Sequence, residues 1–390
     1  MVALLKTTQI QEPSSATVNL ALGSDGTMTT GANMTVTGTA VMSSPYTMRN
    51  KIINGAMTVD QRNAGASVTP TSDFQYTLDR WQARLSVTSK FSVQQNAASV
   101  TPPAGYSNYL GVTSLSAYSV AAGDFFGIQQ RIEGFNVADL AWGTASAQTI
   151  TISFWVRSSL TGTFGGTLSN SAGNRTYPFS FTISSANTWE QKTVTITGDT
   201  SGTWVTNNGT GIQITFGLGV GATYSGTAGS WSSNTYVSAT GAQSVVGTNG
   251  ATFYITGVQL ERGTVATPFE QRLYGHELSL CQRYCFVIPK NTFMGTTGQC
   301  YGVNVAQGAI PLPVSMRSAP TLTAVSDFTG FNVYTSTATT SQMTVFAAAA
   351  SATTELFFWN MNAGSVLTAG NATLVQKSPT NVPLIFSSEL

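Results

Sequence analysis

The sequence predicts an all-β protein, and three observations lead to that class. Segments of 5 to 10 residues alternate apolar residues with Thr, Ser or Gln, and no stretch of comparable length has helical periodicity. Gly-rich turns separate these segments. Charged residues make up only 8% of the chain, against about 25% in an average soluble domain. Short strands joined by such turns predict a sandwich or a barrel.

Composition also excludes several classes of function. A net charge of +1 gives no long-range attraction for nucleic acid or an anionic membrane. No run approaches the roughly 18 apolar residues of a membrane span, and the opening MVALLKTTQIQEPSS lacks the pattern of a signal peptide. Three cysteines form no disulfide framework, and a single histidine makes a zinc site improbable. We therefore expect no nucleic-acid partner, no membrane insertion and no resident cofactor.

Residues 1–50 form a first region. VNLAL at 18–22 alternates and is followed by a turn, but strands this short and lightly apolar cannot bury a core within one chain. A flexible tail is one interpretation. We favour an N-terminal intertwined β segment built by several copies, because the alternation is regular and proline is scarce. This region is therefore expected to order only against partners.

Residues 51–275 form the main region. Strands are predicted at 149–158, 177–183, 193–197 and 211–220, and a closing strand begins at Phe253. The apolar positions 150, 152, 154 and 156 share one face of the first strand, and positions 212, 214, 216 and 218 share one face of the last. In the closing strand, Phe253, Ile255 and Gly257 are expected on one face, and Tyr254, Thr256 and Val258 on the other. Pro268 cannot donate to a sheet ladder, so the sheet should have ended by that residue.

Residues 276–390 form a second all-β module, for which we expect a β-sandwich. The pattern at 276–286 fits one short helix or a linking strand and does not decide between them. Phe357, Phe358 and Trp359 are consecutive, so at least one ring must leave the core of the monomer. Together with the N-terminal region, this exposed ring predicts a stable homotrimer.

Several segments resemble a family of virion proteins of tailed bacteriophages, the tail fibres and receptor-binding proteins. They are KTTQIQEPSS, MRNKIINGAMTVDQRNAG, YTLDRW, TISFWVRSS, TWEQKTVTITGDTSGTW, ITGVQLERGTVATPFEQR, CQRYCF and PVSMRSAPT, in this order. The resemblance implies a homotrimer located in the virion, with an N-terminus attached to the particle and a distal C-terminal tip. The main region is similar to the jelly-roll sandwiches of carbohydrate-binding modules. The tip carries no motif that identifies a receptor.

Aromatic side chains are the candidate ligand-binding residues, because a sugar ring can stack its C–H face on an indole or phenol. On the strand at 149–158, Trp155 faces away from the apolar set, beside Arg157. The other candidates lie in loops rich in Gly, Ser and Thr: Trp204, Tyr224, Trp231 and Tyr236. The alternative for each aromatic is burial against another loop or a neighbouring chain.

Acidic residues offer two weaker candidates. Glu261 and Glu270 flank a turn and could be the paired carboxylates of a glycosidase, but pairing with Arg80, Arg262 or Arg272 is the better interpretation. Asp79, Asp124 and Asp199 lie in turns where jelly rolls often hold a structural calcium ion, yet no DxDxDG-like loop exists. Local capping by Asp is favoured.

Three hypotheses follow from these patterns. The first is a tail fibre that attaches to the particle by its N-terminus and binds the host surface, a glycan or lipopolysaccharide. The second is a structural collar, adaptor or head-decoration fibre without a receptor role. The third is a polysaccharide-degrading spike; we expect no enzymatic activity, since no repeat of the required period and no catalytic triad is present.

Overall fold

The computed structural model describes residues 9–10, 20–22, 28–30, 48–290, 294–322, 331–335, 340–348, 352–363, 367–377 and 383–390. The chain forms two compact units, residues 1–46 and 47–390. In the first unit, β1 (Gln9–Ile10), β2 (Leu20–Leu22) and β3 (Met28–Thr30) form an antiparallel sheet in that order. The rest of the segment expected to intertwine lies outside the described residues, so intertwining stays a prediction.

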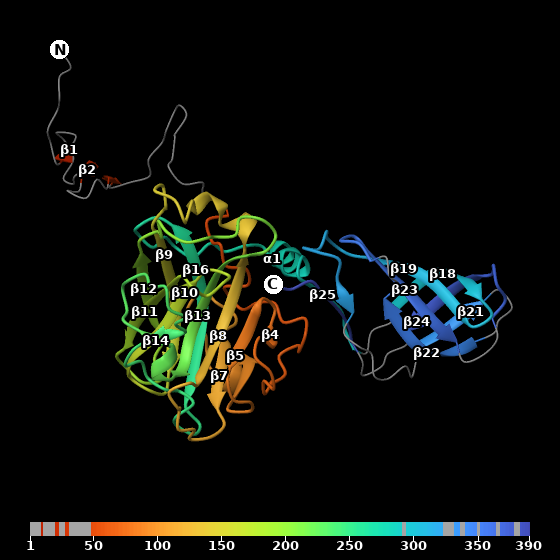
Figure 1. The fold of residues 1–390 in the computed structure, drawn as a ribbon, viewed down its shortest axis with the longest axis horizontal. Coiled ribbons are helices and arrows are strands. Elements are labelled where there is room, and N and C mark those ends of the chain that lie inside the picture. Colours follow the sequence, from red (N-terminus) through yellow and green to blue (C-terminus); the bar gives the residue numbers. More distant parts are fainter. Residues whose placement is uncertain are drawn as a thin grey trace, which may run out of the picture. The chain divides into compact units, whose positions relative to one another are not determined.

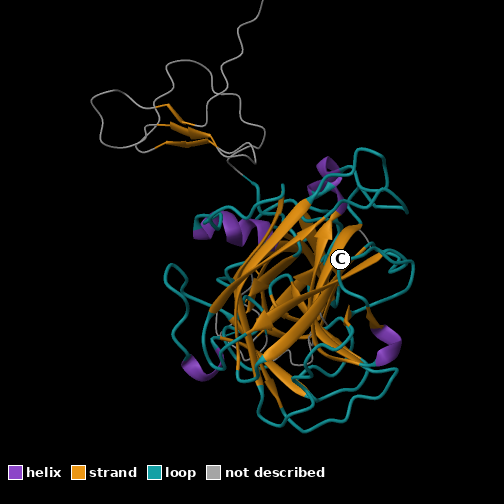
Figure 2. Cartoon of the chain, turned by 90° about the vertical axis from the view of Figure 1, so that its left-hand side faces the viewer, coloured by secondary structure: helices purple, strands orange, loops and turns teal. Residues whose placement is uncertain are grey.

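The central region is a sandwich of two antiparallel sheets (Figures 1 and 2). One sheet has six strands in the order β11-β10-β13-β8-β5-β4, and the other has five in the order β12-β9-β16-β7-β6. Their bounds are β4 Tyr76–Leu78, β5 Trp81–Leu85, β6 Phe91–Gln95, β7 Leu110–Ser114, β8 Phe125–Glu133, β9 Ile150–Ser158, β10 Gly162–Ser169, β11 Thr176–Ile183, β12 Glu190–Ile196, β13 Thr210–Val220 and β16 Thr252–Arg262.

Short elements lie between these strands. A parallel pair, β14 (Ser225–Gly226) and β15 (Ser238–Ala239), lies next to the six-stranded sheet. Four 3₁₀ turns complete the region: η1 Ala97–Ser99, η2 Gly134–Asn136, η3 Ala138–Leu140 and η4 Ala222–Tyr224. The all-β class and the central sandwich predicted from alternation are confirmed.

The core lies between the two sheets. The predicted inward faces are confirmed: Ile150, Ile152, Phe154 and Val156 on β9 are fully buried, as are the matching positions 214, 216 and 218 on β13. The rings of Phe154 and Phe216 meet edge to face across the sandwich, with centroids 5.0 Å apart. Each fully buried aliphatic or aromatic side chain contributes about 1.5–3 kcal/mol, so these two strands hold the sheets together.

Strand β16 is confirmed as a central strand, paired with β9 and β7, and it ends at Arg262, before Pro268. The predicted face assignment is wrong in its second half. A bulge interrupts the register between Thr256 and Gln259, and Gly257 takes a left-handed backbone with φ +61°. The extra residue reverses the alternation, so Val258 points into the same core as Phe253.

The pattern at 276–286 fitted either a helix or a linking strand, and in the structure most of it belongs to helix α1 (Tyr274–Gln282). A three-stranded sheet follows in the order β17-β25-β20. A closed barrel has the order β18-β19-β23-β22-β21-β24. The bounds are β17 Cys285–Ile288, β18 Met294–Gly302, β19 Val305–Pro311, β20 Thr321–Leu322, β21 Phe331–Thr335, β22 Thr340–Ala348, β23 Leu356–Ala363, β24 Ala372–Lys377 and β25 Leu384–Ser387.

The barrel differs from the sandwich expected for this region. Strand β18 pairs with β19 on one side and with β24 on the other, so the sheet closes and no edge is left to cover. Phe357 and Trp359 are buried inside the barrel, whereas Phe358 faces outward and is half-buried. One ring of the three thus leaves the core, as predicted.

Buried polar contacts join the residues around the three-stranded sheet β17-β25-β20 to the central sandwich. Glu389, just after β25, accepts bonds from Arg80 and from Arg62, the latter over 3.1 Å. The Arg80 guanidinium also lies 3.7 Å above the ring of Tyr284. All three cysteines are free and buried, and burial raises the pKa of the Cys281 thiol well above its usual range. No described helix has the length and apolar character of a membrane span.

Candidate functional site

A groove lies on the outward face of the six-stranded sheet. Alternation along β5, β8, β10 and β13 turns their apolar residues into the core and their polar residues outward. Loops at 171–173 and 235–237 form its walls. We call it the central groove; its volume is about 180 Å³, and it is lined by Phe74, Arg84, Gln129, Arg131, Thr167, Ser169, Gln213, Thr215 and Tyr236, among others.

The floor of the central groove is held by side-chain hydrogen bonds that run across the strands. Gln82 Nε2 donates to Gln129 Oε1 over 2.7 Å, and Gln129 Nε2 donates to Thr215 Oγ1 over 2.8 Å. Gln213 Nε2 donates to the carbonyl of Asn170 over 2.8 Å. Buried amides that are fixed in this way lose little freedom when a ligand binds, so the floor is pre-organised.

Phe74 lies at one end of the central groove in an unusual conformation. Its φ is +62°, in the left-handed region that bulky residues avoid, and the residue is 40% exposed. The guanidinium groups of Arg84 and Arg131 each lie 4.3 Å from the ring centroid. A strained backbone that keeps an aromatic ring exposed and rigidly placed is typical of a ligand-binding position.

The two arginines of the groove already have partners. Arg84 Nε bonds Asp73 Oδ1 over 3.0 Å, and Arg131 Nη1 donates to the carbonyl oxygen of Leu390 over 2.7 Å. Burial lowers the pKa of Arg131, but a guanidinium remains protonated at neutral pH. Both cations therefore serve chiefly to hold Phe74 and the adjacent C-terminal residues.

Tyr236 is the sequence-predicted residue that lines the central groove. Its ring packs on Gly226, where a Cβ would come within 2.3 Å of Cδ2, and Asn234 Nδ2 donates to its hydroxyl over 2.9 Å. Gly226 thus allows the ring to lie against β14 at the wall of the groove. Phe74 and Tyr236 supply the aromatic surfaces, and the amides and hydroxyls lie between the walls.

Trp204 and Trp231, also predicted, come together but elsewhere. Both meet the ring of Trp142 edge to face, at 4.7 and 5.4 Å, and Trp231 packs likewise on Tyr177 at 5.2 Å. Their indole nitrogens donate to the backbone carbonyls of Ser201 and Thr197. Because each ring is half-buried against its neighbours, this aromatic cluster has a packing role, with its outer edges still accessible.

Trp155, Arg157 and Tyr224 lie outside the central groove. Trp155 is half-buried on the outward face of the five-stranded sheet, opposite Thr256. On the same strand Arg157 donates from Nε to the carbonyl of Asn187 over 2.9 Å and lies 5.5 Å from the ring of Tyr254. Tyr224 meets Phe125 edge to face. The predicted residues therefore divide among separate surfaces, and their ligand contacts stay predictions.

The acidic candidates are engaged by protein donors. Glu261 accepts from Gln259 Nε2 and from Thr267 N and Oγ1, and Glu270 accepts from Asn50 N and pairs with Arg272 at 3.4 Å. The expected arginine partner is thus present for Glu270, whereas Glu261 binds an amide and a hydroxyl. These carboxylates fix the chain around residue 267.

The three aspartates considered for calcium have protein partners as well. Asp199 forms a two-point ion pair with Arg175, at 2.6 and 2.7 Å, and Asp79 accepts two bonds from Gln61. Asp124 accepts from Ser86, Tyr118 and Ala121. Within the described residues no group of three metal-binding side chains occurs. Local capping and pairing describe what these aspartates do in the structure.

Four residues of the groove are not among those predicted from the sequence: Phe74, Arg84, Arg131 and Gln213. Gln213 was visible as a polar position of an alternating strand, as were Gln129 and Arg131 on β8. The sequence does not give the strand order, which places β8 between β13 and β5 and so brings these side chains together.

Comparisons with known proteins give partial structural similarity. No protein family and no curated protein matches the chain. The enzymatically active domain of tailspike protein 4 of bacteriophage CBA120 is similar with a TM-score of 0.31 and 12% identity, over 55% of this chain and 22% of the tailspike domain.

Two carbohydrate-binding modules are similar over the same extent. TmCBM61, solved in complex with beta-1,4-galactotriose, gives a TM-score of 0.28 at 13% identity, over 55% of this chain and 99% of the module. The family 11 module from Clostridium thermocellum gives 0.26 at 12%, over 52% and 98%. The similarities extend over about half of this chain.

Proposed function

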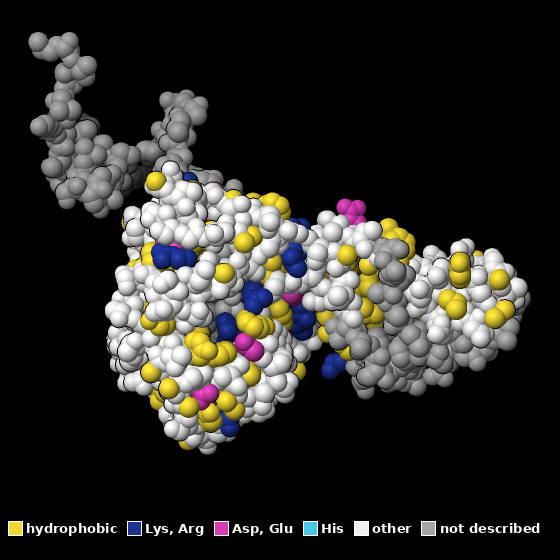
Figure 3. All heavy atoms as spheres, viewed as in Figure 1, with side chains coloured by type: hydrophobic (Ala, Val, Ile, Leu, Met, Phe, Trp, Pro, Cys, Tyr) yellow, Lys and Arg dark blue, Asp and Glu magenta, His cyan; other side chains and the backbone are white. Residues whose placement is uncertain are grey.

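We propose that this protein binds carbohydrate and that the central groove holds the saccharide. The observation that carries this proposal is the groove itself, in which amides and hydroxyls lie between two aromatic side chains, Phe74 and Tyr236. Sugar hydroxyls both donate and accept hydrogen bonds, and sugar C–H faces pack on aromatic rings, so both kinds of surface are used. Most of the face seen in Figure 3 is uncharged, with scattered Lys, Arg, Asp and Glu side chains. Among the described residues that line the groove itself, only Arg84 and Arg131 are charged, and both are engaged by protein partners, which suits an uncharged ligand.

We further propose that the chain is a bacteriophage tail fibre. The support is the ordered set of sequence motifs that resemble such proteins. In this proposal three copies form a trimer, residues 1–50 attach to the particle, and the saccharide belongs to the host surface, as a glycan or lipopolysaccharide. Three weak sites on one axis raise avidity by roughly 10²–10⁴ when receptor spacing allows. A structural collar or decoration fibre is the alternative, and a polysaccharide-degrading spike is the second.

A glycan array with the purified protein tests the binding proposal. Wild type is expected to bind at least one class of saccharide, and Tyr236→Ala and Gln213→Ala should each weaken that binding about tenfold or more. Tyr274→Ala is the matched control, because Tyr274 is 61% exposed on α1, away from the groove. Equal binding by wild type and Tyr236→Ala would contradict the assignment of the groove.

Three further measurements test the biological setting. Light scattering should give three times the 40.9 kDa of one chain; a monomer would refute the trimer. Purified protein should block phage adsorption equally at low and at about 0.5 M salt, because few charges are available to be screened. Immunogold labelling of the head or collar, without inhibition of adsorption, would favour the structural alternative.

A further inference from the structure

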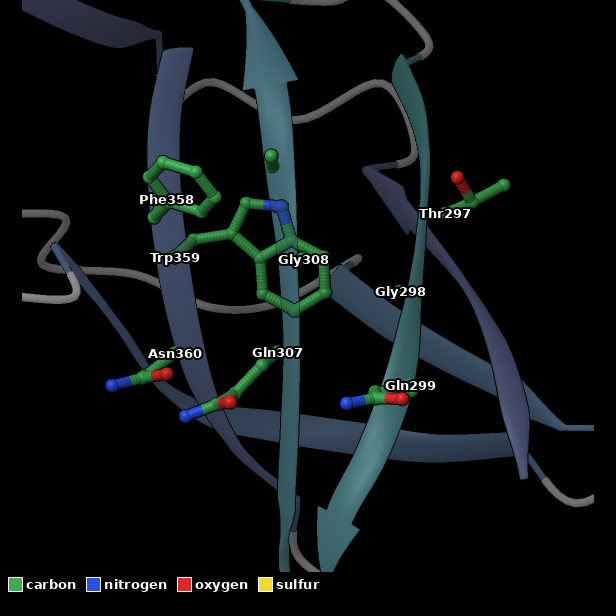
Figure 4. Close-up of a pocket in the computed structure, with 9 residues that line it drawn as sticks. Thr297, Gly298, Gln299, Gln307, Gly308, Phe358, Trp359 and Asn360 are labelled. Carbon is green, nitrogen blue, oxygen red and sulfur yellow. The ribbon is translucent and has the colours of Figure 1, made fainter. Parts of the chain in front are cut away.

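A shallow depression of about 620 Å³ lies on the outer face of the barrel, across β18, β19 and β23 (Figure 4). We call it the barrel depression. Gln299 pairs with Gln307, and Gln307 pairs with Asn360, so strand register alone aligns three carboxamides in one row. Figure 4 shows the three amides at one level of the sheet. Neighbouring strands are about 4.8 Å apart, so an amide recurs at that interval along the row.

An apolar position adjoins the amide row. Ala309 pairs with Phe358 two residues along the strands, and the small side chain of Ala309 leaves the half-buried ring of Phe358 accessible beside it. Thr297 adds a hydroxyl on β18. All the described residues that line the depression are uncharged. The surface therefore offers amide donors and acceptors, one hydroxyl and one aromatic ring.

The sheet beneath the depression is rigidly supported. Gly298 and Gly308 are paired, and a Cβ on Gly308 would lie 2.2 Å from Cζ2 of Trp359. The two glycines thus admit the Trp359 indole against the inner side of the barrel wall, where that residue is fully buried. A large ring packed behind three strands holds them at one level, so the amide row keeps its spacing.

One acceptor in the row lacks a partner. Asn360 Oδ1 is buried and has no hydrogen-bond partner among the described residues. A buried acceptor without a donor is costly, and a bound hydroxyl would relieve that cost. Asn360 lines the depression beside Gln307, so a rotation of its carboxamide toward the depression would bring this acceptor to a ligand hydroxyl.

We propose that the barrel depression is a second saccharide-binding site, for a neutral, extended oligosaccharide lying across the three strands. Successive sugar units meet successive amides, and one unit stacks its C–H face on Phe358. A sugar hydroxyl can both donate to a carboxamide oxygen and accept from a carboxamide N–H, so it suits every residue of the row. The uncharged lining leaves a carboxylated or sulfated glycan without a cation. This proposal stands on the barrel alone and does not depend on the central groove.

A second copy of this chain is the competing occupant of the same face. Interfaces between copies are enriched in aromatic and apolar residues at their centre, whereas the centre of this surface is a row of carboxamides with one ring at its side. If a second copy covered the row, each carboxamide would need a hydrogen-bond partner from that copy, and any carboxamide left without one would be costly. The chemistry favours a ligand rich in hydroxyl groups.

The test uses the full chain with the central groove weakened by Tyr236→Ala. Cellohexaose, xylohexaose and chitohexaose serve as neutral probes and hexagalacturonate as the charged probe, with binding measured by calorimetry and by saturation-transfer NMR. We expect at least one neutral probe to bind, and Asn360→Ala or Phe358→Ala to weaken it about tenfold or more. Asn304→Ala, which removes an exposed carboxamide from the β18–β19 turn, is the matched control and should leave binding unchanged.

Other outcomes overturn the proposal. They are no neutral probe bound in the Tyr236→Ala background, unchanged binding in both the Asn360 and Phe358 variants, or a preference for hexagalacturonate. If the Asn360 or Phe358 variant changes the mass seen by light scattering but leaves saccharide binding unchanged, the face is assigned to contact between copies. If Tyr236→Ala has no effect on wild-type binding while Asn360→Ala abolishes it, the central groove fails and the barrel site stands.

Discussion

Glu133 and Arg283 form a two-point ion pair across 150 residues of sequence, with distances of 2.6 and 3.0 Å. Glu133 is 1% exposed at the end of β8, and the hydroxyl of Tyr284 also donates to it over 2.6 Å. Burial alone would raise the pKa of Glu133, but the bonds from Arg283 and Tyr284 outweigh burial and hold that pKa below its ordinary value. The pair fixes α1 to the central sandwich.

Glu133→Gln should therefore destabilise the protein. The pair is largely buried and is exposed only on the arginine side, so its loss should lower the free energy of unfolding by about 2–3 kcal/mol. Urea unfolding at pH 7 measures this change. Because the folded-state pKa is lowered, this stabilisation is present above the ordinary glutamate pKa and is lost as pH falls below it. Asp139→Asn, in an exposed pair with Lys51, is the control and should cost less than about 1 kcal/mol. Equal costs would contradict the prediction.

Asp79 should show the opposite pH dependence. It is fully buried, and burial raises its pKa to about 6, although Arg62 and the bonds from Gln61 oppose the rise. Between pH 4 and 6 the folded state keeps a proton that the unfolded state has lost, so raising the pH through this range disfavours folding. Relative to Asp79→Asn, wild type should lose about 1–3 kcal/mol as pH rises from 4 to 6.5. A constant difference in urea unfolding would refute this.

The glycines of the barrel provide a matched pair of substitutions. A Cβ at Gly308 would meet the Trp359 ring at 2.2 Å and the Thr297 carbonyl oxygen at 2.5 Å, whereas nothing lies within 4 Å of one at Gly302. Gly308→Ala should cost about 1–3 kcal/mol through overpacking, and Gly302→Ala close to none. Thermal unfolding of the two variants measures the difference, and similar melting temperatures would show that the indole does not lie against Gly308.

The aromatic cluster should couple energetically. The rings of Trp204 and Trp231 meet edge to face with centroids 5.5 Å apart. A double-mutant cycle with Trp204→Ala and Trp231→Ala should give a coupling of about 0.5–1.5 kcal/mol in unfolding free energy. A coupling near zero would mean that the rings act independently, as expected for separate ligand platforms.

Much of the central core could be predicted from alternation. The inward faces of β9 and β13 followed directly from their sequences, because a strand buried on one face repeats its apolar residues every second position. The bulge at Gly257 could not be foreseen in this way. One extra residue changes which side chains face inward, and the local pattern of β16 is apolar on both sides, so it does not reveal the change.

The candidate site and the barrel depend on contacts between distant segments. Closure of the barrel requires β18 to pair with β24, about 75 residues later, and the sequence of neither strand identifies its partner. Phe74 lies in a loop whose left-handed backbone follows no periodic pattern. Trp204 and Trp231 were candidates for ligand contact because their loops are polar. Their partial burial comes from Trp142 and Tyr177 and from their contact with each other, which the local sequence does not show.

The contacts of Glu389 set an order of events during synthesis. The central sandwich, being N-terminal, leaves the ribosome first, and at roughly 5–20 residues per second it waits several seconds for residue 389. Until then Arg62 and Arg80 lack the carboxylate that pairs with both. Strand β25, which lies between β17 and β20, must also emerge before that sheet can form. A nascent chain stalled before residue 384 should therefore lack both the three-stranded sheet and the carboxylate that pairs with Arg62 and Arg80.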